Sequence, residues 1–484
     1  MKTNKDNYKK IEAGDIDFFK STLGADCVLN DTESRQEYGH DQTEDFVFEP
    51  DVVLKPSSTE QVSRILEWCN NHKIAVTARG AGTGLSGGAL AIYGGVCLSS
   101  ERFNRILSID ESNFQAVVEP GVINQVFQDT VAEKGLFYPP DPASKGSCYM
   151  GGNVAHSSGG PRALKYGTTK DFILNLEVVL ADGTIIWTGA NTLKYSTGYH
   201  LTQLMVGSEG TLGFVTKIVV KLLPLPKHNL LMLASFNDAG KACAAVAQIF
   251  QKGITPSALE FMERDAILYT MSYTDVSHPL PDHAQAQLLI EVDGNYMETL
   301  YKDCEIINTV LEEAGVTNVL FADNDFEKNK LWALRRKIGE AVKAQSIYKE
   351  EDTVVPRAYL PELLTGVKNI GRKYGFASAC YGHAGDGNLH VNILKGNLDS
   401  ETWDKTIKKA IVEIFELCKS LGGTISGEHG IGLVQQEFMP IMFSQYELDL
   451  MRGIKNVFDP NGIMNPGKIF SEISHQSVVN SNES

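Results

Sequence analysis

The stretch IAVTARGAGTGLSGGA, residues 74–89, runs from a predicted strand straight into a loop that contains five glycines. Glycine has no Cβ, so such a loop exposes consecutive backbone N–H groups that can surround a pyrophosphate. Arg79 or Thr83 would add a positive charge or a hydroxyl to the same site. A glycine-rich loop alone is a weak indicator of phosphate binding, so the residues around it decide its meaning.

The flanking residues place this loop in an α/β unit. Before the loop, residues 58–61 form a predicted capping box, and one apolar helix face follows it, made of Val62, Ile65, Leu66 and Cys69. After the loop, the Gly94-Gly95 turn leads into a second predicted strand at residues 96–99. The G-x-G-x-x-G loop of a Rossmann fold opens a helix instead, so this loop is not that dinucleotide fingerprint.

A second glycine-rich block, PPDPASKGSCYMGGNVAHSSGGP, covers residues 139–161. Its length indicates close approach of the backbone to a long ligand, and a dinucleotide is long enough. Predicted strands with turn signals follow, at residues 173–180, 185–187 and 214–223. Pro224 and Pro226 then mark a domain boundary. Beyond them helices alternate with strands, such as residues 288–293 and the predicted helix from Phe326 to about Ala344, which predicts an α+β domain on an antiparallel sheet.

The composition narrows the class of protein. A chain of 484 residues exceeds what one hydrophobic core usually serves, so two or three domains are expected. A formal charge of −16 opposes attraction to nucleic acid or anionic lipid, and we discount nucleic-acid partners. The eight cysteines include no C-x-x-C pair, so neither a disulfide framework nor an iron–sulfur cluster is indicated. The polar first residues and the lack of a long apolar stretch predict a soluble, cytoplasmic protein.

Two histidine-containing frames indicate a metal site. GHAGDGNLH spans residues 382–390 and SGEHGIG spans residues 426–432. Glycines allow a tight turn after His383, and the residues from His390 onward alternate like a strand, with Asn392 on the face of His390. Two neutral imidazoles and the carboxylate of Glu428 suit Zn²⁺ first, or Mn²⁺ or Fe²⁺, and leave positions open for substrate oxygens. A hydrogen-bonded core position is the alternative for either histidine.

Taken together and in this order, these blocks resemble the FAD-linked oxidase family of the vanillyl-alcohol-oxidase type, in the branch of glycolate, D-lactate and D-2-hydroxyglutarate dehydrogenases. The resemblance spans about residues 45 to 470. It implies an α+β fold in which a two-subdomain FAD-binding domain carries an α+β cap domain, built on an antiparallel sheet, that binds substrate. The implied segments are an N-terminal helical arm (1–45), the FAD-binding domain (46–225), the substrate cap domain (226–430), a C-terminal segment that completes the FAD site (431–470) and a flexible tail (471–484).

In that family the loop that matches residues 79–88 binds the FAD pyrophosphate. The blocks that match PPDPAS and GGNVA line the isoalloxazine and the ribityl chain, and GSEGTLG (207–213) with NPGK (465–468) completes the flavin site. The residues implied to bind FAD are Arg79, Gly80, Ala81, Gly82, Thr83, Gly84, Leu85, Ser86, Pro140, Asp141, Ser144, Gly146, Ser147, Gly151, Gly152, Asn153, Ala155, Glu209, Gly210, Val215 and Asn465.

The resemblance also assigns roles at the reacting centre. It makes His383, His390 and Glu428 the metal ligands and His429 the base. LWALR, residues 331–335, is similar to the family's L-W-x-x-R, whose arginine binds the substrate carboxylate, and a planar guanidinium suits that task. Arg335 and Asn392 are therefore the expected substrate contacts. The implied reaction moves the hydroxyl proton to His429 and the α-hydride to flavin N5.

Departures from the family pattern narrow the prediction further. Thr83 and Gly84 stand where some relatives carry a histidine that binds FAD covalently, so FAD is expected to be non-covalent. His156, directly after the GGNVA block, is not the usual residue and has no assigned role. The cysteine-rich extension of some relatives is missing, so electrons are expected to pass to a separate acceptor, either a quinone or an electron-transfer protein.

The substrate prediction rests on one short segment. Relatives that act on 2-hydroxyglutarate carry a threonine where this chain has Gly339 and a lysine where it has Glu350. Glu350 and Glu351 would repel a second substrate carboxylate, so a monocarboxylate is expected.

The sequence thus predicts FAD- and metal-dependent oxidation of a D-2-hydroxy acid to the 2-oxo acid, with D-lactate or glycolate favoured. The alternatives are a D-2-hydroxyglutarate dehydrogenase, a flavin oxidase that uses O2 on a sugar acid or alcohol, and a redox-inactive flavoprotein subunit that binds a partner enzyme. The full set of four site residues disfavours the last, because a scaffold needs no metal ligands. A homodimer is compatible with the sequence, which does not fix the oligomeric state.

Overall fold

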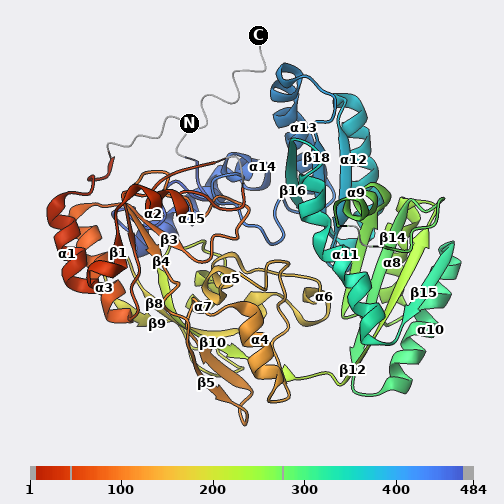
Figure 1. Ribbon diagram of the computed structural model, residues 1–484, viewed down its shortest axis with the longest axis horizontal. Helices are drawn as coiled ribbons and strands as arrows, with labels where there is room; N and C mark the ends of the chain where they lie inside the picture. The colour runs from red at the N-terminus through yellow and green to blue at the C-terminus, as the bar shows by residue number, and fades with distance from the viewer. Residues whose placement is uncertain (1–6, 44–45, 275–276, 472–484) are drawn as a thin grey trace.

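The structure, a computed structural model, describes residues 7–43, 46–274 and 277–471. An N-terminal half, red to yellow in Figure 1, lies beside a second half, green to blue. The chain then returns, so that the C-terminal helices α14 (Met439–Met442) and α15 (Gln445–Phe458) lie over the N-terminal half. In the described residues, the N-terminal half contains two larger sheets and a two-stranded pair, and the second half contains one large sheet.

The first sheet presents the glycine-rich loop at the end of one strand. Its four strands, in the order β1-β2-β4-β3, are β1 (Val28–Leu29), β2 (Val52–Leu54), β4 (Val96–Ser99) and β3 (Val76–Arg79). The last three are parallel, and α3 (Thr59–His72) connects β2 to β3. Ser58 caps α3 by accepting a hydrogen bond from the N–H of Gln61, and the predicted apolar face of α3 is fully buried.

The N-terminal segment, which was expected to be a separate helical arm, packs into this first layer. Helix α1 (Ala13–Leu23) buries Phe19 completely in the same core as α3, and β1 pairs with β2. Helix α2 (Thr32–Glu37) follows β1. At the other end of the chain, Met464 forms a parallel bridge with Val76, so the closing residues extend the same sheet.

The second sheet is antiparallel and has five strands in the order β5-β6-β10-β8-β9. Their bounds are β5 (Ile106–Asp110), β6 (Gln115–Val118), β10 (Phe214–Lys221), β8 (Ile173–Val179) and β9 (Ile185–Trp187). The helices of this part are α4 (Asn124–Ala132), α5 (Met150–His156), α6 (Ala163–Tyr166) and α7 (Leu201–Met205). A small pair, β7 (Leu136–Phe137) with β11 (Leu223–Pro224), precedes the second half.

The second half is built on one antiparallel sheet of seven strands, as predicted, in the order β15-β12-β14-β13-β17-β18-β16. The bounds are β12 (His228–Phe236), β13 (Ala258–Glu263), β14 (Ala286–Gly294), β15 (Asn318–Ala322), β16 (Tyr348–Val354), β17 (Ala377–Gly382) and β18 (Asn388–Leu394). Its helices are α8 (Ala239–Gln251), α9 (Arg264–Thr274), α10 (Met297–Glu313), α11 (Asp325–Lys343), α12 (Leu360–Tyr374) and α13 (Ser400–Ser420).

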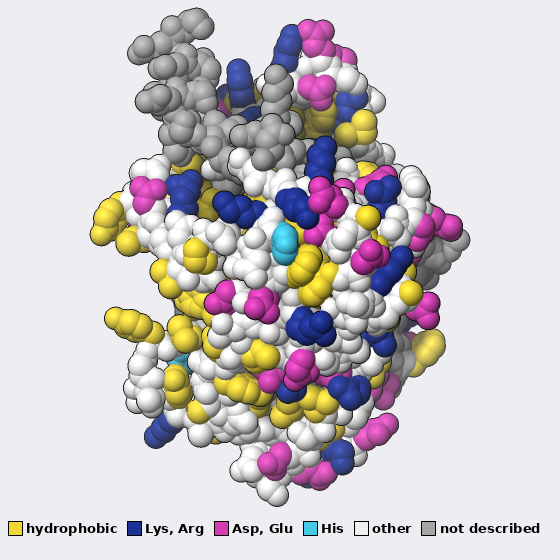
Figure 2. Space-filling view, turned by 90° about the vertical axis from the view of Figure 1, so that its left-hand side faces the viewer, with side chains coloured by type: hydrophobic (Ala, Val, Ile, Leu, Met, Phe, Trp, Pro, Cys, Tyr) yellow, Lys and Arg dark blue, Asp and Glu magenta, His cyan; other side chains and the backbone are white. Residues whose placement is uncertain are grey.

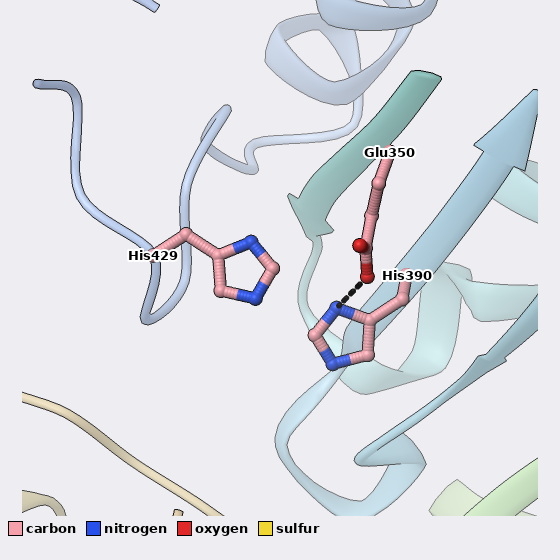
Figure 3. Close-up of side chains that lie close together, drawn as sticks. All are labelled: Glu350, His390 and His429. Atoms are coloured by element: carbon pink, nitrogen blue, oxygen red, sulfur yellow. Dashed lines mark ion pairs between the residues drawn. The ribbon is translucent and has the colours of Figure 1, made fainter. Parts of the chain in front are cut away.

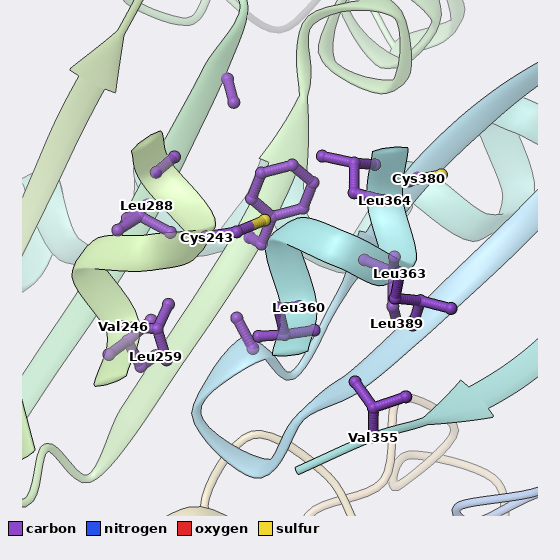
Figure 4. Packing of buried hydrophobic residues seen from close by; sticks show 14 of the residues in the cluster. Cys243, Val246, Leu259, Leu288, Val355, Leu360, Leu363, Leu364, Cys380 and Leu389 are labelled. Atoms are coloured by element: carbon purple, nitrogen blue, oxygen red, sulfur yellow. The ribbon is translucent and has the colours of Figure 1, made fainter. Parts of the chain in front are cut away.

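Helices cover both faces of this large sheet. Helices α8, α10, α12 and α13 share a core with one face, where Figure 4 shows Val246 of α8 beside Leu259 and Leu288 of the sheet. Helices α9 and α11 pack on the other face. Leu389, Val391 and Ile393 of β18 belong to the first core, so by alternation His390 and Asn392 lie on the face that α11 covers. The predicted alternation of this strand is confirmed.

The surface carries both signs of charge. On the face drawn in Figure 2, basic and acidic side chains are interspersed with small hydrophobic patches. Within the described ranges, every helix is too short or too polar to cross a lipid bilayer.

Candidate active site

A cavity of about 1100 Å³ lies where the two halves meet. One wall is made by the glycine-rich loop and the 141–162 block, and the opposite wall by α11 and the ends of β16, β17 and β18. The cavity is larger than a small acid alone requires, since pockets for drug-sized ligands span roughly 300–1,000 Å³.

Most residues expected to bind the flavin line this cavity. They are Arg79, Gly80, Ala81, Gly82, Thr83, Gly84, Leu85, Asp141, Ser144, Gly146, Ser147, Gly151, Gly152, Asn153, Ala155, Glu209, Gly210 and Val215. Ser86, Pro140 and Asn465 are not on its wall. Asn465 lies behind the wall, where its side-chain amide donates to the backbone oxygens of Gly88 (2.9 Å) and Glu209 (2.7 Å). It supports the site from outside.

The glycine-rich loop fits a ligand that approaches the backbone closely. Gly82 has φ of +72°, a conformation that favours glycine. A Cβ on Gly80 would lie 3.6 Å from the Cα of Gly152, so the two glycine-rich blocks are in contact at this point of the cavity wall. Arg79 is buried and donates from Nη2 to the backbone oxygen of His40 at 2.9 Å, so its guanidinium holds the loop against the N-terminal segment.

The three predicted metal ligands come together in the cavity, where Glu428 also lies against Gly159 of the 141–162 block. Glu428 Oε1 lies 3.3 Å from His383 Nε2 and 3.6 Å from His390 Nε2. Ligand atoms bonded at about 2.0–2.1 Å to a tetrahedral ion are separated by about 3.3–3.4 Å. Each residue can offer one ligand atom within 4.8 Å of the others, so the donor set fits a single divalent ion. Among the described residues, a second group of this kind consists of Glu350, His390 and His429 (Figure 3).

The ring of His383 is oriented by a carboxylate that the sequence did not single out. Glu260 of β13 is fully buried, and each of its two carboxylate oxygens lies 2.9 Å from His383 Nδ1. A carboxylate can only accept here, so Nδ1 carries the proton and Nε2 is left free as a ligand. Burial alone would raise the pKa of Glu260, but His383 and Arg335 together lower that pKa below its ordinary value.

Arg335, the predicted carboxylate-binding residue, lines the cavity and is only 7% exposed. Its Nη2 and Nε lie 2.6 and 2.8 Å from Glu260 Oε2, and its guanidinium lies over the ring of Tyr381. Glu260 therefore fixes both a metal-ligand candidate and the arginine. Asn392, the other expected substrate contact, is fully buried and is not part of the cavity wall. Asn392 is therefore not in a position to contact the substrate in this cavity.

Strand β16 presents Glu350 to the cavity and turns Glu351 away from it. Glu350 lies 3.5 Å from Lys343 Nζ, accepts from Tyr381 Oη at 3.2 Å and lies 3.9 Å from His390 Nδ1. Figure 3 shows it pointing at His390. Glu351 is on the other face, where its carboxylate accepts from Gln435 at 2.8 Å. The expectation that both glutamates meet the substrate is therefore wrong for Glu351, because adjacent strand residues point to opposite faces.

His429, the predicted base, stacks on His390 with ring centroids 5.2 Å apart. It lines the cavity between the two walls. Burial would lower the pKa of His429, but the carboxylates of Asp352, Glu350 and Glu428 raise it above its ordinary value. The surroundings thus stabilise the proton that a base would accept.

Three residues that shape this cavity carry no signal that singles them out as site residues in the sequence, namely Asp352, Tyr381 and, apart from its position, Glu260, and the contacts of His156 also appear only in the structure. A Cβ on Gly88 would lie 3.4 Å from the ring of His156, so that ring covers the glycine-rich loop. One signal was present for Glu260, since a carboxylate inside the apolar run Ala258–Met262 must face a buried partner. The partners themselves are distant in sequence.

Two family models match most of this chain. Residues 50–189 match the family model described as "FAD binding domain", and residues 225–469 match "FAD linked oxidases, C-terminal domain". Among solved structures, p-cresol methylhydroxylase with substrate bound has a TM-score of 0.79 at 19% identity, covering 96% of this chain and 98% of that one. That likeness confirms the predicted fold.

Several curated proteins are similar over nearly their whole length. The glycolate oxidase subunit GlcD of Bacillus subtilis (strain 168) is 39% identical over 91% of this chain and 93% of its own. The D-lactate dehydrogenase of Anaerostipes hadrus is 38% identical over 96% and 98%. The D-2-hydroxyglutarate dehydrogenase of Stutzerimonas stutzeri (strain A1501) is 34% identical over 94% and 98%.

Proposed function

Because this chain belongs to the FAD-linked oxidase family, we propose that it oxidises a small D-2-hydroxy acid to the 2-oxo acid, using non-covalent FAD and one divalent metal ion. One observation carries the proposal. The ligand set His383, His390 and Glu428, the candidate base His429 and the guanidinium of Arg335 all line one cavity, whose opposite wall is the glycine-rich loop.

Each cavity residue has a separate task in this reaction. When bound, FAD would accept two electrons and the metal ion would lower the pKa of the substrate hydroxyl. Arg335 orients the substrate carboxylate, since Glu260 fixes the plane of its guanidinium. His429 takes the hydroxyl proton, and the three nearby carboxylates stabilise its charged form.

A monocarboxylate such as D-lactate or glycolate suits the end of the cavity near β16. Burial alone would raise the pKa of Glu350, but His429 and Lys343 lower it below its ordinary value, so Glu350 stays ionised at neutral pH. A second substrate carboxylate would have to displace Glu350 from Lys343 and would meet its repulsion. A methyl group or hydrogen avoids that cost.

Lys343 nevertheless favours one alternative substrate, D-2-hydroxyglutarate. It places an ammonium on the cavity wall, two helical turns beyond Arg335. If a diacid is the substrate, Lys343→Met should abolish its use and leave D-lactate oxidation within about threefold. If a monoacid is the substrate, the same variant should affect every acid alike.

The electron acceptor in this proposal is a separate quinone or electron-transfer protein. The competing hypothesis is an oxidase that passes electrons to O2. Stopped-flow mixing of the reduced protein with air-saturated buffer distinguishes them, because an oxidase should reoxidise within its turnover time and a dehydrogenase should not.

The proposal is tested by anaerobic mixing of the purified protein with glycolate, D-lactate, D-2-hydroxyglutarate and the L isomers, with flavin absorbance as the signal. We expect rapid bleaching by D-lactate or glycolate and slow or no bleaching by the L isomers. A kcat/KM for D-2-hydroxyglutarate that is ten times that for both monoacids, or more, would overturn the monoacid assignment. Failure of all the acids to bleach the flavin would contradict the proposed reaction itself.

A further inference from the structure

The segment of residues 426–432, named here the catalytic segment, has neither helical nor strand structure although it carries Glu428 and His429. Irregular backbone near a cavity must find hydrogen-bond partners for its N–H groups from elsewhere. Here the partners are two buried carboxylates, one from each half of the molecule. The catalytic segment is therefore held between the flavin wall and the metal wall.

The carboxylate from the second half is Asp352 of β16. Its Oδ2 accepts from the backbone N–H groups of Gly427 (2.7 Å), Glu428 (2.8 Å) and His429 (2.9 Å), and from the hydroxyl of Ser426 (3.1 Å). Its Oδ1 accepts from Asn388 at 2.7 Å. Asp352 is 1% exposed, so these are charge-assisted bonds in a buried place.

The carboxylate from the N-terminal half is Glu209, which follows α7. Its two oxygens accept from the N–H groups of Ile431 and Gly432, at 2.7 Å each. Glu209 is 6% exposed, and its φ of +52° is unusual for a residue with a side chain. Next to it, the backbone oxygen of Ser86 in the glycine-rich loop accepts from Leu433 N at 2.8 Å. This end of the segment is tied to the loop that faces the cofactor.

The glycines of SGEHGIG allow both ends to approach closely. A Cβ on Gly427 would lie 2.6 Å from a methyl carbon of Val354, beside Asp352. A Cβ on Gly430 would lie 2.7 Å from His156 Nδ1 and 2.9 Å from Glu209 Oε1. A Cβ on Gly432 would collide with the backbone oxygen of Ser86. Gly427 thus allows a close contact with the second half of the molecule, and Gly430 and Gly432 allow close contacts with the first half.

We propose that Asp352 and Glu209 are positioning residues that set the catalytic segment from its two ends, Asp352 fixing the backbone of Glu428 and His429 on the metal side and Glu209 fixing Ile431 and Gly432 against the flavin loop. This inference rests on the proposed function. Neither residue acts as a ligand or base. Both carboxylates accept hydrogen bonds from backbone N–H groups, and both oxygens of Asp352 are hydrogen-bond acceptors. Each anchor therefore has its own measurable consequence.

The test compares Asp352→Asn and Glu209→Gln with two matched controls. Glu263→Gln alters a carboxylate in the same sheet as Asp352 that accepts from Cys380 N and Lys368. Glu177→Gln alters a buried carboxylate in the same half of the molecule as Glu209 that accepts from Thr59 and Thr216. For each full-length holoprotein the readouts are FAD content, Zn²⁺ affinity by chelator competition without substrate, and the anaerobic rate of flavin reduction by saturating D-lactate.

The two variants should differ in which readout they change. Asp352→Asn should keep FAD and lose about 10- to 100-fold in Zn²⁺ affinity, as loss of a partner that supports a ligand does. Glu209→Gln should keep Zn²⁺ affinity within about threefold. Its rate of flavin reduction should fall by about 10-fold or more, because a small displacement of a reacting group lowers the rate by at least that factor. Both controls should match wild type in Zn²⁺ affinity and reduction rate.

Wild-type Zn²⁺ affinity and reduction rate in Asp352→Asn and Glu209→Gln would overturn the inference while the proposed function stands. Loss of both properties to the same extent in each variant would also overturn it, because that indicates general disruption. If Asp352→Asn does not fold, Ser426→Ala serves instead. It removes one bond to Asp352 and the bond from Gly430 N, and should weaken Zn²⁺ binding several-fold without loss of FAD. A wild-type protein that binds no divalent ion would refute the proposed function and the inference with it.

Discussion

Replacing Glu260 by glutamine removes the one anion that holds both His383 and Arg335. Glu260 is 0% exposed and Arg335 7% exposed, so the variant leaves a buried guanidinium without its counter-charge. Breaking such a buried pair from one side costs about 3–5 kcal/mol. Glutamine keeps one carbonyl oxygen that can still accept from Arg335 or His383, so we expect the lower end, about 3 kcal/mol of unfolding free energy.

The same change also acts on metal binding. His383 Nδ1 loses the carboxylate that lies at 2.9 Å and sets its tautomer. Loss of such a partner lowers metal affinity about 10- to 100-fold, or about 1.4–2.8 kcal/mol. Glu263→Gln is the matched control, because Glu263 is on the same strand but pairs with Lys368, which is 31% exposed. The control should lose no more than about 2 kcal/mol and keep its metal affinity.

Urea unfolding measures the change in unfolding free energy, and competition with a chromogenic chelator measures the Zn²⁺ affinity. If Glu260→Gln binds Zn²⁺ as tightly as wild type, the role of Glu260 in orienting His383 is refuted. If its stability loss is no larger than that of Glu263→Gln, the buried pair with Arg335 does not contribute as the geometry indicates.

Four further outcomes are expected. His429→Asn should keep FAD and metal and reduce flavin about 10²- to 10⁴-fold more slowly, measured by anaerobic stopped flow; a rate near wild type would assign the proton to another group. Acid precipitation should leave yellow FAD in the supernatant, and a flavin that stays with the pellet would refute non-covalent binding. Arg335→Ala should lower kcat/KM for every hydroxy acid by an amount equivalent to about 2–5 kcal/mol, whereas Glu350→Lys should improve D-2-hydroxyglutarate selectively; the reverse pattern would refute the carboxylate assignment. Burial raises the pKa of Glu351 from 4.5 to about 7, so the folded protein binds the extra proton in that range and loses stability as pH rises through it. Glu351→Gln should therefore exceed wild type in urea midpoint by more at pH 8 than at pH 5, and an equal difference at both would contradict this.

Local patterns in the sequence were enough to predict some of the elements around the site, although not β13 and β16. The alternation from Leu389 to Ile393 predicted the strand and which residues share each of its faces, and the predicted helix from Phe326 to about Ala344 matches α11 within one residue at each end. Ser58 caps α3 as predicted, but the box is incomplete, because the side chain of Gln61 accepts from Ser57 N at 2.8 Å and not from Ser58 N. These features depend on residues that are close in sequence, and the helix and strand periodicities and the preferences of helix caps describe such local relations.

The parts that were missed depend on distant partners. Glu260 and His383 are 123 positions apart, and Asp352 and His429 are 77 apart, so only the sheet order brings them together. The N-terminal segment was misjudged because its polar composition masks Phe19, whose burial requires the α3 layer. The substrate prediction placed both Glu350 and Glu351 near the substrate, although alternation along a strand points adjacent side chains to opposite faces.

The central claim is tested most directly by one measurement, the anaerobic flavin reduction of a single protein preparation by D-lactate or glycolate before metal removal, after chelation and after Zn²⁺ is restored. His383, His390 and Glu428 lie on the wall opposite the glycine-rich loop, so chelation should leave the oxidised flavin spectrum nearly unchanged. We expect fast bleaching in the loaded protein, loss of bleaching after chelation and recovery on adding Zn²⁺ or Mn²⁺. Bleaching at an unchanged rate in metal-free protein would contradict the account.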